Sequence, residues 1–171
     1  SVRSRKNWYT IEQEVNFDLL IPRTFNKRFN CYKGGLLFSD RFYGIKTDYS
    51  KPLFYFLNST IFILFVESLA KQGLGLGALD LNIIELNKIP AIKDFDYPKN
   101  VKDRQSHEIF EELGINEDSP IRSQNPSPMQ DRQMIDNAIF DAVGLSAEER
   151  KEVYLATCEL VQRRIGKARS V

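Results

Sequence analysis

Hydrophobic residues are most concentrated in one stretch of the chain, residues 53–90. Its first part, residues 53–70, is apolar on nearly every side, which is typical of a helix buried all round. Glu67, the polar patch at residues 58–60 and the length of this part argue against a membrane span, which needs about 20 apolar residues. Three glycines follow, Gly73, Gly75 and Gly77, and we expect the helix to end before them. The pattern predicts one long buried helix.

Shorter apolar and aromatic runs precede this helix. They are bounded by Pro22 and by a Lys33-Gly34-Gly35 sequence that is typical of a hairpin turn. The runs predict strands at residues 8–11, 15–21, 25–32, 36–38 and 42–47. The first fifty residues therefore predict a small, twisted sheet, mixed or antiparallel.

The chain becomes increasingly helical after the glycines. We expect a short helix capped by Asp80 and a last strand at residues 88–92, followed by a polar linker. Helices should then begin at Ser106 and Asp131 and end at Gly114 and Gly144. A Ser146-Ala-Glu-Glu capping box predicts a final helix that runs to about residue 167.

These elements predict an α+β fold, in which a small mixed sheet with a buried helix is followed by a helical C-terminal tail. We expect an α+β domain over residues 1–95, a linker with one short helix over residues 96–130, and the tail over residues 131–171. The chain has 171 residues, of which 42% are hydrophobic and 27% charged, as in a globular protein. It shows no signal-peptide pattern, and we expect a cytoplasmic location with Cys31 and Cys158 as free thiols.

Charge is distributed unevenly along the chain. Residues 1–51 hold ten Lys or Arg against five Asp or Glu, whereas residues 52–171 hold fourteen against eighteen. A basic first third that also contains many aromatic residues is suited to nucleic acid, because Lys and Arg neutralise phosphates and polar side chains read base edges. The alternative is that the aromatic residues form the sheet core and the charges a solvated rim. The candidate DNA contacts in this region are Arg23, Asn26, Lys27, Arg28, Lys33 and Arg41.

Motifs for catalysis or metal binding are weak. The only histidine, His107, is expected on the surface at a helix start, and the pair Glu111-Glu112 is expected to face solvent. An apolar helix rather than a strand precedes the glycines, which argues against a nucleotide-binding loop. A nuclease pattern of Asp80, Glu85 and Lys88 has poor spacing. We therefore predict no catalytic residues and no metal site.

Several short motifs nevertheless follow one another in an order that resembles a known family. The resemblance is to the region after the catalytic domain in the adenine-specific DNA methyltransferases of restriction–modification systems. The chain is similar to their target-recognition domains and to type I specificity subunits, and the C-terminal helices from Asp131 onward resemble the tail of many such chains. The motifs are Trp8, Ile21-Pro22-Arg23, Phe42-Tyr-Gly-Ile45, Leu57-Asn-Ser59, the glycine-rich break with Ala78-Leu-Asp-Leu81, and Lys88-Ile-Pro90.

The resemblance implies a non-catalytic region that binds double-stranded DNA and works with an upstream methyltransferase domain. It adds Gly75 and Gly77 as backbone contacts, because glycine amides can approach phosphates closely. S-adenosylmethionine is implied only for the catalytic domain, since its binding segments are absent here, and the sequence at Asn125-Pro-Ser-Pro128 lacks the aromatic residue that stacks a flipped base. The rival hypothesis is a protein-interaction module whose helical tail docks a partner without DNA contact. A stand-alone enzyme is a third, weaker alternative.

Overall fold

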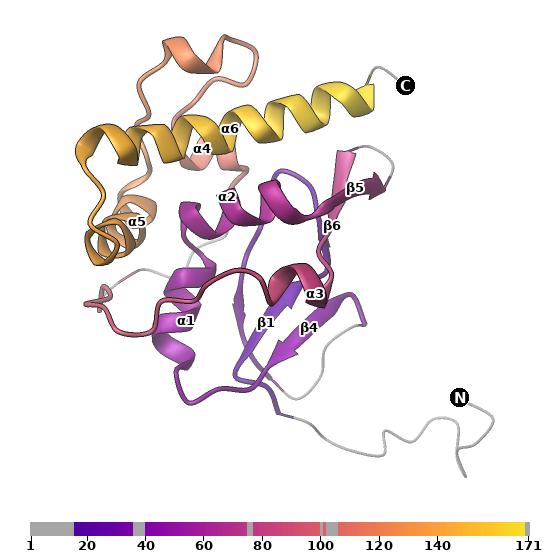
Figure 1. The fold of residues 1–171 in the computed structure, drawn as a ribbon, viewed down its shortest axis with the longest axis vertical. Coiled ribbons are helices and arrows are strands. Elements are labelled where there is room, and N and C mark those ends of the chain that lie inside the picture. The colour runs from indigo at the N-terminus through magenta and orange to yellow at the C-terminus, as the bar shows by residue number, and fades with distance from the viewer. Residues whose placement is uncertain (1–15, 36–39, 75–76, 100, 102–105, 170–171) are drawn as a thin grey trace, which may run out of the picture.

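The computed structural model describes residues 16–35, 40–74, 77–99, 101 and 106–169 and has the predicted α+β class (Figure 1). The strands and helices run in the order β1 (Leu19–Pro22), β2 (Thr24–Phe25), β3 (Tyr32–Lys33), β4 (Phe42–Ile45), α1 (Ser50–Leu57), α2 (Thr60–Leu69), β5 (Lys71–Leu74), β6 (Ala78–Asp80), α3 (Ile83–Leu86), α4 (Ile109–Glu112), η3 (Ile121–Ser123), α5 (Gln130–Ala142) and α6 (Ala147–Arg169).

The described strands form two small sheets, with the orders β3-β1-β4 and β2-β6-β5. Every pairing is antiparallel, so the mixed alternative is wrong for the described strands. Arg23 joins the sheets through its backbone, because its N–H donates to the Arg41 carbonyl (2.8 Å) and its carbonyl accepts from the Leu81 N–H (2.8 Å). The strands predicted at residues 8–11 and 36–38 lie outside the described residues.

The predicted single helix over residues 53–70 is wrong, because the chain breaks into α1 and α2 with a bend of 65°. Two polar side chains stabilise the break. Ser59 caps α2 by accepting a hydrogen bond from the Phe62 N–H, and the Asn58 amide binds both the N–H (3.0 Å) and the carbonyl (3.1 Å) of Cys31. Among the described residues no single helix is long and apolar enough to cross a membrane, and α1 and α2 pass that test only when joined across their bend.

The glycine-rich segment also differs from the prediction. Strand β5 begins directly after α2, so the glycines do not end the helix. Asp80 lies in β6 opposite Thr24, and Asn82 caps α3 instead, with its side chain accepting from the Glu85 N–H (3.0 Å). Residues 88–92 form no strand, although Ile89 and Ile92 pack against the core.

The C-terminal helices largely follow the sequence pattern. Gly114 and Gly144 end α4 and α5 with positive φ angles of 61° and 71°. The capping box is confirmed, since the Ser146 N–H donates to Glu149 (2.8 Å) and the Glu149 N–H donates back to Ser146 (3.3 Å). Helix α4 is shorter than predicted and begins only at Ile109.

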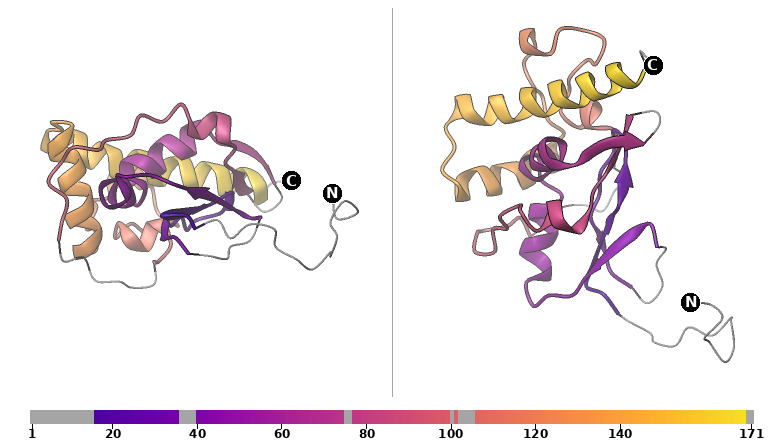
Figure 2. Two further views of the ribbon diagram at one scale, coloured as in Figure 1. Left: turned by 90° about the horizontal axis from the view of Figure 1, so that it is seen from below. Right: turned by 45° about the vertical axis from the view of Figure 1, so that its right-hand side comes forward.

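Helix α6 runs along α2, and α5 packs against both α1 and α2 (Figures 1 and 2). One cluster of buried apolar side chains extends from Leu19 in β1 through Phe62 and Val66 in α2 to Val161 and Ile165 in α6. The C-terminal helices therefore share a core with the sheets. The two cysteines are buried and unbridged, as expected, and burial raises the pKa of the Cys158 thiol to about 12.

Candidate nucleic-acid interface

A basic groove of about 540 Å³ lies beside α1, and we call it the lysine groove. It is lined by Asp18, Leu19, Lys33, Ser50, Lys51, Phe54, Tyr55, Tyr97, Pro98, Lys99 and Val101. Its three lysines are exposed and come from three separate segments of the chain. Among the described lining residues, Asp18 is the one acid, and its carboxylate already accepts the Thr47 N–H (2.8 Å). The groove thus attracts anions.

The wall of the lysine groove is aromatic. The rings of Tyr55 and Tyr97 stack with centroids 5.4 Å apart and planes 21° from parallel. Phe54 meets Tyr55 edge-on at 5.6 Å, and the Lys33 ammonium lies 5.8 Å from the Phe54 centroid. Ammonium groups held beside aromatic rings suit a nucleic-acid backbone, because the cations neutralise its phosphates. Lys33 is the one predicted DNA contact in this groove.

Three predicted arginines lie on the surface outside the groove lining. Arg23 is exposed, with its guanidinium 5.2 Å from the Tyr43 centroid and a 3.3 Å hydrogen bond to the Asp40 carbonyl. Arg28 and Arg41 are also exposed. The side chain of Arg28 makes no hydrogen bond or ion pair with the residues that the structure describes. Their contacts with DNA remain predictions.

Lys27, by contrast, is held inside the protein. Its ammonium pairs with Glu117 at 2.5 Å and with Glu108 at 3.4 Å, and only 15% of its side chain is exposed. The hydrogen bond to Glu117, with help from Glu108, raises the pKa of Lys27 despite burial. The Lys27 carbonyl also accepts the Ile109 N–H (2.9 Å), so this residue fastens the segment after β2 to α4.

Two other predicted contacts, Asn26 and Gly77, surround the buried guanidinium of Arg164. Arg164 forms a two-pronged ion pair with Glu67, in which Nε donates to Oε2 at 2.9 Å and Nη2 to Oε1 at 2.7 Å. It also donates to the carbonyls of Asn26 (3.1 Å) and Gly77. Both ion-pair side chains are at most 2% exposed, and burial raises the pKa of Glu67 against the opposing effect of Arg164. Gly75 lies outside the described residues.

A second buried network joins α5 to the α1–α2 break. Asp136 accepts hydrogen bonds from the Thr60 N–H and hydroxyl, both at 2.7 Å. Arg132 donates to Glu112 at 3.2 Å and to the Asn58 carbonyl. The prediction that Glu112 faces solvent is wrong, since its side chain is 1% exposed. A carboxylate in the first turn of α4 turns inward here because a buried arginine meets it.

Sequence reasoning missed most of these buried charges. Glu67 is the one buried charge that the sequence indicates, because it lies in an apolar run. A carboxylate surrounded by apolar residues on a helix needs a buried partner. The partner, Arg164, is 97 positions away and lies between other basic residues that are exposed. Nothing in its local sequence separates it from them.

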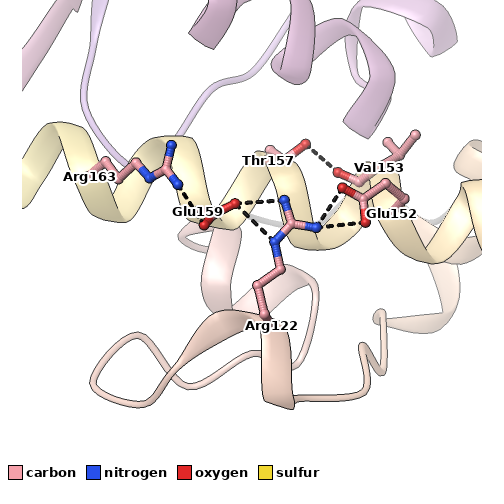
Figure 3. A network of polar contacts seen from close by, with 6 residues as sticks. All are labelled: Arg122, Glu152, Val153, Thr157, Glu159 and Arg163. Atoms are coloured by element: carbon pink, nitrogen blue, oxygen red, sulfur yellow. Dashed lines mark hydrogen bonds and ion pairs between the residues drawn. The ribbon is translucent and has the colours of Figure 1, made fainter.

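The outer face of α6 carries a network of exposed ion pairs (Figure 3). Arg122 from η3 donates to both Glu152 oxygens (2.6 and 2.7 Å) and to Glu159 (2.7 and 3.0 Å), and Arg163 reaches Glu159 at 2.8 Å. The hydrogen bonds from Arg122 lower the pKa of Glu159. Part of the acidity of the C-terminal half is therefore neutralised internally.

Within the described part of the chain, no group of three His, Cys, Asp or Glu side chains is placed to hold a metal ion. No protein family, curated protein or solved structure matches the chain.

Proposed function

We propose that this chain is a non-catalytic, DNA-binding region of a restriction–modification adenine DNA methyltransferase. The observation that carries the proposal is the convergence of Lys33, Lys51 and Lys99 on one aromatic groove. Its partners are double-stranded DNA and the upstream methyltransferase domain, which supplies S-adenosylmethionine and the chemistry. A cytoplasmic location belongs to the same proposal.

The charges of the groove suit a polyanion. Among the described lining residues, three lysines face one carboxylate that is already hydrogen-bonded, so these residues have a formal charge of +2. Lys51 and Lys99 make no ion pair with the residues that the structure describes, so their ammonium groups need not break an internal contact to meet a phosphate. Each phosphate contact releases condensed counterions, which makes binding weaken as salt increases.

One observation favours the alternative of a protein-interaction module. Ile83 and Ile84 on α3 are 55% and 68% exposed, and a protein partner that covered them would remove this apolar surface from water. Docking through such a surface depends little on salt. The dependence of binding on salt therefore separates the two functions.

The test is fluorescence anisotropy of this chain with a random-sequence duplex, titrated from about 50 to 200 mM salt. We expect the logarithm of the binding constant to fall linearly with the logarithm of salt concentration. Lys51→Gln and Lys99→Gln should each reduce that slope by about one. The matched control is Lys151→Gln on α6, where the ammonium binds Asn125 (2.6 Å) away from the groove. Absence of binding at the lowest salt, or equal slopes for groove and control variants, would contradict the proposal.

A further inference from the structure

A second cavity of about 370 Å³ adjoins the lysine groove and shares Lys33, Phe54 and Val101 with it. We call it the side cavity. It lies between residues 30–33, the end of α1 and the start of α5. Its volume is in the range of small-molecule sites.

The side cavity differs from the groove in charge. Its described lining residues include two cations, Lys33 and Arg132, and two carboxylates, Glu112 and Asp131, so the formal charges of these residues sum to zero. A neutral cavity beside a cationic groove matches the two halves of a nucleotide, which has an uncharged base and a charged phosphate. The cavity is therefore a poor phosphate site but a suitable base site.

The walls of the side cavity are suited to a flat ring. Tyr32 and Phe54 supply aromatic surface, and Ile135 from α5 supplies an apolar one. Tyr32 is 46% exposed, and its ring meets the Phe42 ring edge-on with centroids 5.9 Å apart. Aromatic side chains in this setting stack bases of any sequence.

The cavity also contains hydrogen-bonding groups that the protein leaves unused. The Ser106 hydroxyl is buried, and it is the one such side-chain atom among the described residues with no hydrogen-bond partner. Buried polar atoms are normally paired, so an unpaired hydroxyl in a cavity indicates a ligand or water. The Arg132 Nε and Nη1 bind Glu112 and Asn58, and its Nη2 makes no hydrogen bond with the described residues.

We propose that the side cavity binds one nucleobase, stacked against Tyr32 and Phe54 and hydrogen-bonded at its edge by Ser106 and Arg132. The inference rests on the proposed function, in that the lysine groove holds the phosphates beside the base. An unpaired base of DNA is the favoured source, because leaving the stack costs least when a base has no partner. A free nucleotide has the same chemistry.

The test compares three duplexes of one length: fully paired, with one bulged adenine, and with an abasic site at the bulge. The abasic duplex is the matched control, because it keeps the distorted backbone and lacks only the base. We expect the bulged adenine to bind about tenfold more tightly than either other duplex, which is within the range that one base–aromatic stack supplies. A parallel titration with the fluorescent nucleoside 2-aminopurine deoxyriboside reports binding of a free base.

Variants separate the cavity from the groove. Tyr32→Ala and Ser106→Ala should each remove most of the preference for the bulged adenine and leave affinity for the paired duplex unchanged. Tyr49→Ala is the control, because Tyr49 is 50% exposed and lies outside the lining of the cavity. Lys51→Gln should weaken all three duplexes equally and preserve the preference.

The outcomes distinguish this inference from the proposed function. Equal affinity for the bulged and abasic duplexes, with no nucleoside binding, overturns the base site while salt-dependent duplex binding still supports the groove. Nucleoside binding that Tyr32→Ala abolishes, without any duplex binding, supports a base site for free nucleotides and contradicts the DNA-binding function. A preference that survives both cavity variants also overturns the inference.

Discussion

The lysine groove and the surroundings of Arg164 use basic side chains in opposite ways. Lys51 and Lys99 are exposed, and solvent hydrates their ammonium groups. Arg164 is 2% exposed, and its N–H groups donate to Glu67 and to two carbonyls. A buried guanidinium must keep its partners, because an unpaired charge in the interior is strongly unfavourable. An exposed ammonium can exchange water for a ligand at little cost. Position in the fold, and not residue type, therefore decides which cations are available for binding.

The Arg164 side chain also explains how the C-terminal helix is joined to the sheets. It reaches from α6 to Glu67 on α2, to the segment after β2 and to Gly77 before β6. A single side chain thus fixes three segments that are distant in sequence.

The largest expected effect tests this contrast directly. Arg164→Met should lower the free energy of unfolding by about 3–5 kcal/mol, because it leaves the Glu67 carboxylate buried without a partner. Urea unfolding followed by circular dichroism measures the change. The neighbouring exposed pair gives the control, since Arg163→Met removes only a contact to Glu159 at the surface and should cost less than about 1 kcal/mol. Similar losses for the two variants would contradict the assignment of Arg164 as a structural charge.

Asp136 gives the next largest effect on stability, and the size of this effect depends on pH. Burial raises the pKa of Asp136 above its ordinary 3.8, although Arg132 and Thr60 oppose the shift. A raised pKa in the folded state means that this group contributes most stability below pH 3.8 and loses it as pH rises through the folded pKa.

Asp136→Asn should cost about 1–3 kcal/mol, because the amide cannot accept all the hydrogen bonds of the carboxylate. Its side chain does not titrate, so the stability advantage of the wild type over the variant should shrink as pH is raised from about 4 to 8. Urea unfolding at several pH values measures this difference. An advantage that grows with pH would show that the pKa is lowered instead.

Gly77 provides a smaller effect with a close control. It has a φ angle of +73°, and an added Cβ would lie 3.2 Å from both Ala168 Cβ and Ile165 Cδ1. Gly77→Ala should therefore cost about 1–2 kcal/mol in backbone strain, with crowding added. Gly144 has nearly the same φ angle (+71°) but open space around it, so Gly144→Ala measures the strain alone. Thermal unfolding of both variants should place Gly77→Ala at the lower midpoint, and equal midpoints would rule out the crowding against α6.

Local sequence patterns predicted much of this fold. Glycines past the last turn located the ends of α4 and α5, and the Ser146 box located the start of α6, because these signals act within a few residues. The break after α1 was missed for the opposite reason. Asn58 and Ser59 look like tolerable polar residues in an apolar helix until the Cys31 backbone, 27 positions away, is placed beside Asn58.

The candidate site was less predictable than the fold. Lys33 was selected from the sequence, but Lys51 and Lys99 were not, because they belong to segments that only the tertiary structure brings together. Asn26, Lys27 and Gly77 fitted a DNA-binding pattern equally well, and the structure places all three against buried or half-buried charges. Charge and spacing identify a basic region, but partners across the fold determine which of its charges are already used.

Substitutions of the adjacent residues Lys27 and Arg28 should have the smallest effects on stability. They also compare a paired cation with an exposed one at neighbouring positions. Lys27 pairs with Glu117 and Glu108, whereas Arg28 is exposed and contacts no described acid. Lys27→Met should lower the free energy of unfolding by about 1 kcal/mol, and Arg28→Met should change it by less than about 0.5 kcal/mol. For duplex binding we expect the reverse, with the salt slope reduced by about one in Arg28→Met and unchanged in Lys27→Met. A reduced slope in Lys27→Met, at unchanged stability, would mean that DNA displaces Glu117 from the ammonium, and the distinction between used and available charges would then fail at this position.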